Sequence, residues 1–168
     1  MNIADINCDM GEGMTNDAAI MPFISSANIA CGYHAGNEQT IWDTVKLAKE
    51  FKVAVGAHVS FLDVANFGRN EMELPAPAIY ELVIQQLMII REITDSFEIK
   101  LHHVKPHGAL YNMAAKDAGM AKAIAEAVRD FDDQLVLYGL SNSLSIKEAA
   151  AIGLKTANEV FADRKSVV

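Results

Sequence analysis

The sequence predicts an α/β fold in which a parallel β-sheet is flanked by helices. Six short segments rich in β-prone residues alternate with helices or long loops, an order that is typical of parallel sheets. The segment 53–58 is apolar throughout, as expected for a strand buried on both faces. The length of 168 residues fits a single domain over residues 1–168. Periodicity alone does not decide whether the sheet is open or curls into a barrel.

The expected strands are separated by loops that contain glycine or proline. A histidine-rich stretch, 101–108, provides the fourth strand, which Pro106 and Gly108 are expected to end. The other five strands are expected at 3–8, 24–31, 53–58, 134–138 and 154–161.

Helices are expected between these strands. Asn37 is a suitable N-cap for a helix that runs to about Phe51. Pro75 and Pro77 stand at the start of a helix over 76–95, where a missing N–H costs little. This helix is apolar on more than one face, so it is expected either to lie deep in the fold or to form a subunit contact. Two further helices are expected at 116–130 and 143–152.

Composition excludes several classes of protein. The net charge is −8 without any block of lysine or arginine, which argues against nucleic acid or an anionic membrane as the main partner. Apolar runs such as 87–90 are too short to span a bilayer, and residues 1–5 do not begin a signal peptide. Two cysteines, Cys8 and Cys31, cannot build a disulfide framework. We therefore expect a soluble cytoplasmic protein.

Residues suited to catalysis gather where the predicted strands end. Four of the five histidines lie at or just past such an end. Because the carboxyl ends of parallel strands meet at one edge of a sheet, we expect these residues to converge on one site. They are Asp9, Glu12, His34, His58, His103, Lys105, His107, Asp163 and Arg164.

Three interpretations of this set remain open. A carboxylate and two or three imidazoles from different strands can hold a divalent metal with one position left for water. The same groups can instead work without metal as general acids and bases. In the third interpretation Asp9 caps a turn or a helix, and His34 and His58 are hydrogen-bonded core residues. The ligand spacing is less specific than a helical HExxH motif, so it does not identify the metal.

Other motifs narrow the choice. The chain has neither a GxGxxG nor a GxxxxGK[ST] pattern, and no Gly-x-Ser-x-Gly elbow, which disfavours the common nucleotide sites and serine hydrolases. Arg69, in a long loop, either binds an anionic substrate group or is simply solvated. Lys105, at a buried strand end, is expected to pair with a carboxylate or to face a ligand.

Taken together, six segments resemble the LamB/YcsF family, the group that includes the A subunit of the bacterial ATP-dependent 5-oxoprolinase. The matching segments occur in the family's order and span essentially the whole chain. They are 5–13, 24–36, 55–60, 66–69, 103–112 and 159–164.

The resemblance implies an irregular, TIM-like (β/α) barrel of the glycoside hydrolase/deacetylase type. It also implies a role in opening the lactam ring of 5-oxo-L-proline to give L-glutamate, with ATP as co-substrate and subunits B and C as partners. In such a reaction Lys105 and Arg69 would stabilise developing charge, while Asp9 or Glu12 would activate water together with a histidine or a metal. Since no P-loop is present, ATP would bind at a family-specific site or on a partner protein.

The residues on family motifs carry over as candidates for three roles. The catalytic candidates are Asp9, Glu12, His34, Lys105 and His107. The substrate-binding candidates are Asn7, Arg69 and Tyr111. By analogy with deacetylase barrels, the metal-ligand candidates are Asp9, His58 and one of His103 or His107, with His103 as the first choice.

Family members continue well beyond the motif at 159–164, whereas this sequence stops at Val168. We therefore expect an incomplete barrel, truncated at its C-terminus. Either the sequence is a fragment, or the open edge is covered by another copy or by a partner. Two alternatives to the leading function follow. One is a metal-dependent amide or deacetylase-type hydrolase that works without ATP, and the other is a non-catalytic member that only binds a ligand or a partner.

Overall fold

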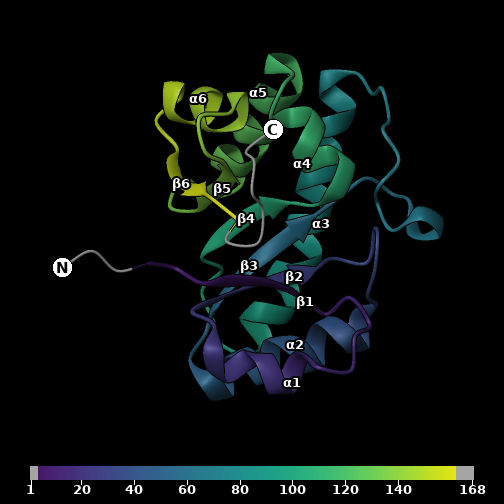
Figure 1. Cartoon of the computed structure of the whole chain (residues 1–168), viewed down its shortest axis with the longest axis vertical. Helices are drawn as coiled ribbons and strands as arrows, with labels where there is room; N and C mark the ends of the chain where they lie inside the picture. The colour runs from purple at the N-terminus through teal and green to yellow at the C-terminus, as the bar shows by residue number, and fades with distance from the viewer. Residues whose placement is uncertain (1–3, 162–168) are drawn as a thin grey trace.

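The protein is described by a computed structural model over residues 4–161. Its centre is a six-stranded, entirely parallel sheet in the order β1-β2-β3-β4-β5-β6, curled into a half-barrel (Figure 1). This confirms the predicted α/β class and the incomplete barrel. The strands are β1 (Asn7–Met10), β2 (Ser26–Ala30), β3 (Ala54–Val59), β4 (His103–Pro106), β5 (Val136–Leu140) and β6 (Lys155–Glu159).

Helices fill the connections between strands. Two of them begin at side-chain caps, because Asn37 accepts from the Thr40 N–H and Asp117 accepts from the Met120 N–H. The α-helices are α1 (Asp17–Ile20), α2 (Glu38–Phe51), α3 (Ala76–Ser96), α4 (Gly108–Ala114), α5 (Ala118–Phe131) and α6 (Leu144–Ala151). Two 3₁₀-helices, η1 (Met21–Phe23) and η2 (Val64–Asn66), lie in the longer loops.

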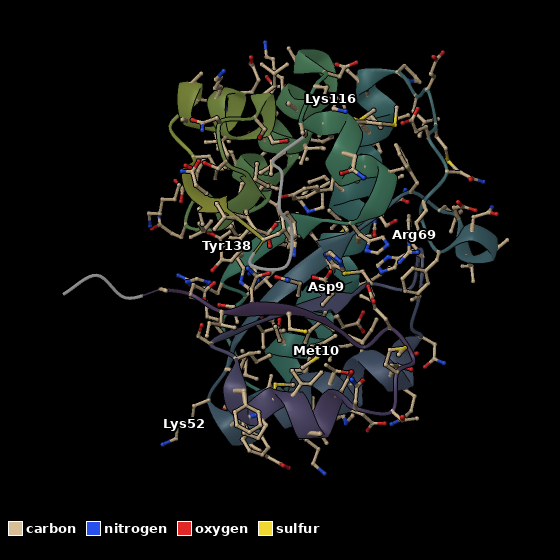
Figure 2. All side chains as sticks on the ribbon, viewed as in Figure 1. Asp9, Met10, Lys52, Arg69, Lys116 and Tyr138 are labelled. Atoms are coloured by element: carbon tan, nitrogen blue, oxygen red, sulfur yellow. The ribbon has the colours of Figure 1, made fainter. Side chains whose placement is uncertain are left out.

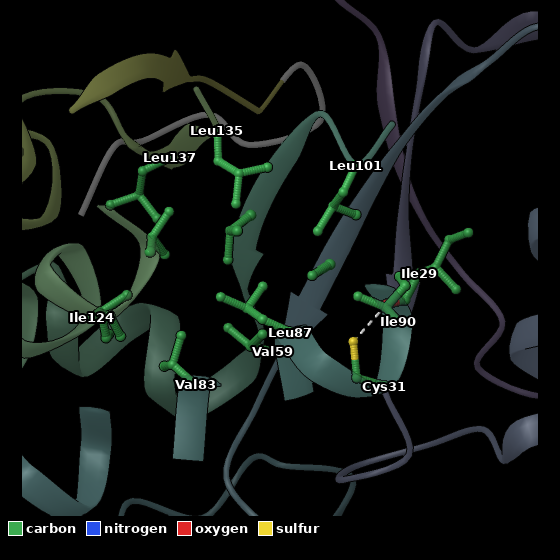
Figure 3. Packing of buried hydrophobic residues seen from close by; sticks show 14 of the residues in the cluster. Ile29, Cys31, Val59, Val83, Leu87, Ile90, Leu101, Ile124, Leu135 and Leu137 are labelled. Carbon is green, nitrogen blue, oxygen red and sulfur yellow. Dashed lines mark hydrogen bonds between the residues drawn. The ribbon is translucent and has the colours of Figure 1, made fainter. Parts of the chain in front are cut away.

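The sequential strand order determines where the helices lie. Right-handed crossovers between neighbouring parallel strands place successive helices on the same side of a sheet. That outer side forms the core, where Val83 and Leu87 of α3 pack beneath Val59 of β3 (Figure 3). Helix α3 is thus buried along one side only and is not sandwiched deep in the fold, since Met88 and Ile89 are exposed on its other side; the alternative prediction of a subunit contact stays a prediction. Within residues 4–161 no helix is long and apolar enough to cross a membrane.

The observed elements differ from the predicted ones in two places that matter for the site. Strand β1 begins and ends later than the predicted segment 3–8, so Asp9 lies within the strand. The chain after the histidine-rich stretch forms α4 before α5 begins, where only the helix over 116–130 was predicted. Because His107 directly precedes α4, this unpredicted helix fixes where its imidazole lies.

Candidate active site

Polar side chains cover the inner side of the half-barrel, the side opposite the helices. In the sheet register Asp9 lies beside Asn28, Asn28 beside Gly56, and Gly56 beside His103. Residues paired in this way point to the same side of a sheet. Two residues further toward the carboxyl ends of β3 and β4, His58 lies beside Lys105. The inner side therefore carries several of the residues that the sequence places near the strand ends, among them Asp9, His58 and Lys105.

One carboxylate and three imidazoles meet at the mouth of the half-barrel. Glu12 Oε1 lies 3.1 Å from His34 Nε2, 3.7 Å from His58 Nε2 and 3.5 Å from His107 Nδ1. Four such donor atoms, one from each residue, all lie within 4.8 Å of one another. The His34 and His107 rings also stack, with centroids 3.9 Å apart. We call Glu12, His34, His58 and His107 the histidine cluster.

Loops and strand ends hold the histidine cluster in place. Asp17 at the start of α1 accepts a 2.8 Å hydrogen bond from the Gly11 N–H, which anchors the turn that carries Glu12. Gly68 lies so close to the cluster that a Cβ there would be 2.2 Å from Ser60 Oγ and 3.0 Å from His107 Cδ2. Its φ of +66° also favours glycine. Glycine at position 68 therefore allows the loop backbone to lie directly against the histidine cluster.

Backbone carbonyls fix the tautomers of two of the rings. His58 Nδ1 lies 2.9 Å from the Lys105 carbonyl oxygen, and His107 Nε2 lies 2.9 Å from the Phe67 carbonyl oxygen. A carbonyl only accepts, so both of these nitrogens carry hydrogen and donate. In neutral rings the remaining nitrogens, His58 Nε2 and His107 Nδ1, would then face each other with lone pairs at 2.9 Å. Such an arrangement requires either a shared proton or a cation.

The cluster therefore fits a divalent metal. Three imidazole nitrogens and one carboxylate oxygen are the ligand types that Zn²⁺ prefers. Metal-binding histidines commonly donate their second N–H to a backbone carbonyl, as His58 and His107 do. Burial lowers the pKa of His34, and burial together with His58 lowers the pKa of His107 to about 4. Neutral rings of this kind keep the lone pair that a metal needs.

A second group surrounds the Lys105 ammonium, next to the histidine cluster. Lys105 Nζ lies 2.8 Å from Glu159 Oε1, 3.1 Å from Asp9 Oδ1 and 3.1 Å from Asn7 Oδ1. Burial alone would lower the pKa of Lys105, but Asp9 and Glu159 outweigh it and raise this pKa. Burial likewise opposes ionisation of Asp9, yet His58 and Lys105 hold its pKa well below the usual range. Lys105 and Asp9 are thus a stable ammonium–carboxylate pair.

Asp9 joins the two groups. Its Oδ1 atom faces Lys105, while its Oδ2 atom lies 3.3 Å from His58 Nε2. Asp9, His58, Lys105 and His107 line a cleft of about 480 Å³, together with Arg69 and Tyr111. Figure 2 shows Asp9 and Arg69 at the same mouth of the sheet, with nitrogen-bearing side chains between them. The cleft is large enough for a small substrate beside both groups.

The substrate-binding candidates lie around this cleft. Tyr111 donates a 2.8 Å hydrogen bond to Glu159 Oε2, and Asn7 accepts from Lys105. The Arg69 guanidinium lies 5.3 Å above the Phe67 ring. Within residues 4–161 no carboxylate pairs with Arg69, which leaves its charge available to an anion. Asp163 and Arg164 lie outside the described residues.

His103 lies apart from the histidine cluster. Its ring is fully buried, stacks 4.2 Å from the Tyr138 ring and donates to Asn28 Oδ1 at 2.7 Å. Four residues along a strand span roughly 13 Å, so His103 and His107 cannot easily hold the same ion. The geometry thus favours His107 over His103 among the two alternatives for the third histidine ligand. It also brings Glu12 and His34 into the set in place of Asp9.

Two residues of the site were not singled out from the sequence. Glu159 is the last residue of β6 and pairs with Lys105, and its position at a strand end inside a family motif was a usable signal. Asn28 lies in the middle of β2 and contacts both Asp9 and Asn7. An asparagine within a short buried strand offers no comparable signal in the sequence, because its partners come from other strands.

Comparison with known proteins places this site in a family. The 5-oxoprolinase A subunit from Staphylococcus carnosus is 53% identical over 166 residues, which cover 96% of this chain and 66% of that protein. The protein of the same name from Bordetella pertussis is 53% identical over 165 residues, 95% of this chain and 66% of its own length. This chain therefore spans slightly less than two thirds of these curated relatives.

A solved structure agrees with the sequence comparison. The crystal structure of the lactam utilization protein from Thermus thermophilus matches with a TM-score of 0.94 and 42% identity, over 96% of this chain and 67% of that one. The model of the LamB/YcsF family matches residues 4–167. The match of the family model and the identity to these relatives show that this chain belongs to the LamB/YcsF family.

Proposed function

We propose that this chain is part of the A subunit of a 5-oxoprolinase, which opens the lactam ring of 5-oxo-L-proline to give L-glutamate with hydrolysis of ATP. One observation carries the proposal. Asp9 lies far in the sequence from Lys105 and His107, yet all three line one cleft in a chain whose relatives bear that name. Subunits B and C are the expected partners.

The reaction makes three demands on the site. The γ-phosphoryl group of ATP is transferred to the lactam carbonyl oxygen, which makes an unreactive amide electrophilic. Water then adds to the ring carbon, the ring C–N bond breaks and the nitrogen gains a proton, which leaves an acyl phosphate. A second water releases phosphate and the glutamate carboxylate. The protein has to stabilise negative charge, activate water and supply a proton.

Lys105 and Arg69 meet the first demand. Lys105 stays protonated between Asp9 and Glu159, so its ammonium offers a fixed positive charge at the floor of the cleft. Fixed charges aimed at a developing oxyanion or phosphoryl group are among the strongest contributions to catalysis. Arg69, which has no carboxylate partner among the described residues, is suited to the substrate carboxylate or to phosphate.

Asp9 and the histidine cluster meet the other two demands. Asp9 Oδ2 lies 3.3 Å from His58 Nε2, so the pair can take a proton from water through one carboxylate–imidazole contact. Without a metal, the proton shared between His107 Nδ1 and His58 Nε2 is placed to return to the leaving nitrogen, because His107 also lines the cleft. With a divalent metal held by Glu12, His34, His58 and His107, these nitrogens would be ligands, and the metal would instead supply Lewis acidity and a water of lowered pKa.

The proposal is tested by measuring 5-oxo-L-proline hydrolysis with and without ATP, and with and without the partner subunits. We expect activity only when ATP and partners are both present. In the assembled enzyme, His107→Ala should lower kcat by about 10²–10⁴-fold, the range for loss of a general acid or base. Lys116→Ala, a change at an exposed residue that does not line the cleft, serves as the control. Full activity of the His107→Ala enzyme would refute the role proposed for this residue.

The histidine cluster also favours a second candidate function, a metal-dependent amide hydrolase that works without ATP. Its donor set resembles a catalytic zinc site more than a phosphoryl-transfer site. Lactam or amide hydrolysis that requires the metal but is unchanged by ATP would favour this candidate. Metal analysis of the purified chain, before and after dialysis against a chelator, provides the complementary measurement.

A further inference from the structure

Asn28 is a buried residue that neither the family motifs nor the reaction assigns to a role. It lies in the middle of β2 with no exposed surface. The sheet register places it in one row with Asp9 on β1, Gly56 on β3 and His103 on β4. The row crosses four strands, so Asn28 stands between the active-site carboxylate and a buried imidazole.

Gly56 makes contact between Asn28 and His103 possible. A Cβ at Gly56 would lie 2.1 Å from His103 Nε2, closer than any real Cβ contact. Because glycine has no side chain, the His103 ring can lie across β3 and reach Asn28 Oδ1 at 2.7 Å. The φ of Gly56 is not unusual. Glycine is required at this position only because His103 leaves no room for a side chain.

The direction of each hydrogen bond follows from Asp9. An ionised carboxylate only accepts, so the 2.8 Å contact between Asn28 and Asp9 Oδ1 must be donated by the Asn28 amide nitrogen. The Asn28 oxygen then faces His103, and His103 Nε2 must carry the hydrogen. The chain of donors thus runs from His103 through Asn28 to Asp9.

Asn28 and Lys105 share their acceptors. The Asn28 amide donates to Asp9 Oδ1 and to Asn7 Oδ1, at 2.8 Å each. Lys105 Nζ donates to the same two oxygens, at 3.1 Å each. With Oδ1 held from two sides, Asp9 Oδ2 is left facing His58 Nε2. The orientation of the Asp9 carboxylate therefore depends on the Asn28 amide.

We infer that Asn28, held by the Nε2–H of His103, is a positioning residue that orients Asp9 and Lys105 for the reaction. In this account His103 is a fixed hydrogen-bond donor. The expected effect on kinetics rests on the proposed function, whereas the hydrogen-bond network can be tested without measuring activity.

The surroundings of His103 support a fixed, neutral donor. Burial, with a smaller contribution from His102, lowers the pKa of His103 to about 3. Its ring is held against Tyr138, with the planes tilted by 23°. His103 Nδ1 faces His102 Nδ1 at 3.2 Å, which is consistent with a bare His103 Nδ1 that accepts. A buried ring that is stacked on Tyr138 and bonded to Asn28 is suited to holding the amide in one orientation.

The network is tested directly by ¹⁵N NMR of the histidine rings in the wild-type chain. We expect His103 to show the pattern of a neutral Nε2–H tautomer throughout pH 5–8, and we expect Asn28→Leu to abolish that fixed pattern. His103→Gln identifies the signals by removing them. A His103 ring that is protonated in this range, or that carries its hydrogen on Nδ1, would overturn the inference.

Kinetics of the assembled enzyme with 5-oxo-L-proline separate positioning from packing. His103→Met and Asn28→Leu should lower kcat by about 10–100-fold with KM nearly unchanged, the usual cost of losing a group that orients another. The amide nitrogen of His103→Gln can replace His Nε2, so this variant should keep kcat about tenfold above His103→Met. Equal losses in the two His103 variants would contradict the inference. If the wild-type complex opens no lactam, the proposed function fails, and the NMR result still decides on the network.

Discussion

The outer side of the sheet carries Val55, Ala57 and Val59 on β3, whereas the inner side of the same strand carries Gly56 and His58. Both sets are almost completely buried. The outer residues pack against helices, while the inner residues make hydrogen bonds and ion pairs with neighbouring strands. Alternation along a single strand therefore separates the residues that stabilise the fold from those that carry the chemistry.

The two sides also differ in how their burial is compensated. Outer residues gain free energy directly, because apolar surface leaves water. Inner residues lose hydration, and only hydrogen bonds and ion pairs with neighbouring groups compensate for this loss. Lys105, for example, pairs with Asp9 and Glu159. We therefore expect substitutions on the outer side to change stability, and substitutions on the inner side to change activity or the pH dependence of stability.

The largest effect on stability is expected on the outer side. Leu87 of α3 is fully buried beneath the sheet, and Leu87→Ala should lower the free energy of unfolding by about 2–5 kcal/mol. The kcat of the protein that remains folded should not change. Urea unfolding measures the first quantity. Met88→Ala is the matched control, because Met88 is 60% exposed and its loss should cost no more than about 0.5 kcal/mol.

An intermediate effect is expected where the inner side is most tightly packed. Gly56→Ala would place a Cβ 2.1 Å from His103 Nε2, so the ring must move away from Asn28. Such overpacking typically costs about 1–3 kcal/mol of stability, and here it should lower kcat as well. The control is Gly119→Ala near the start of α5, an exposed position where a Cβ would meet only the tip of the Asp117 side chain, at 3.3 Å, so stability should change by no more than about 0.5 kcal/mol. Unchanged activity and stability in Gly56→Ala would show that the inner side is loosely packed.

The smallest effect concerns the pH dependence of stability. The pKa of His103 is lowered to about 3 in the fold, whereas an unfolded histidine titrates near 6.5. Below about pH 6.5 the unfolded chain binds a proton that the native chain does not bind, so the free energy of unfolding falls as the pH falls.

This pH effect can be assigned to His103. The loss should reach at most about 1.4 kcal/mol per pH unit for each such histidine. Urea unfolding at pH 7.5 and pH 5.0, with a chelator present, measures it. His103→Gln should reduce the slope, and an identical slope in wild type and variant would show that His103 titrates equally in both states.

Much of the fold could be predicted from the sequence. Strands such as 53–58 and the long helix over 76–95 have clear patterns, and both occur close to the predicted positions. Helix α4 was missed because it has only seven residues and begins at Gly108, two residues after Pro106, where such residues usually interrupt regular structure. The convergence of Asp9, Lys105 and His107 followed from the parallel order of the strands.

The finer arrangement of the site could not be predicted in the same way. His103 and His107 differ by an even number of residues, but one lies within the half-barrel and the other at its mouth. Whether His103 contacts a metal or Asn28 depends on the register of β2 and β3, which a single sequence does not reveal. The choice between two histidines in one motif therefore required coordinates.

We propose that the mouth of the half-barrel, on the inner side of the sheet, is where the lactam is opened. The most direct test is the kcat of ATP-dependent 5-oxo-L-proline hydrolysis by the assembled enzyme that carries Asp9→Asn. We predict a loss of about 10²–10⁴-fold, because the amide keeps the shape of Asp9 but neither accepts the proton nor balances Lys105. A folded Asp9→Asn enzyme with kcat within about twofold of wild type, far outside that range, would contradict the account.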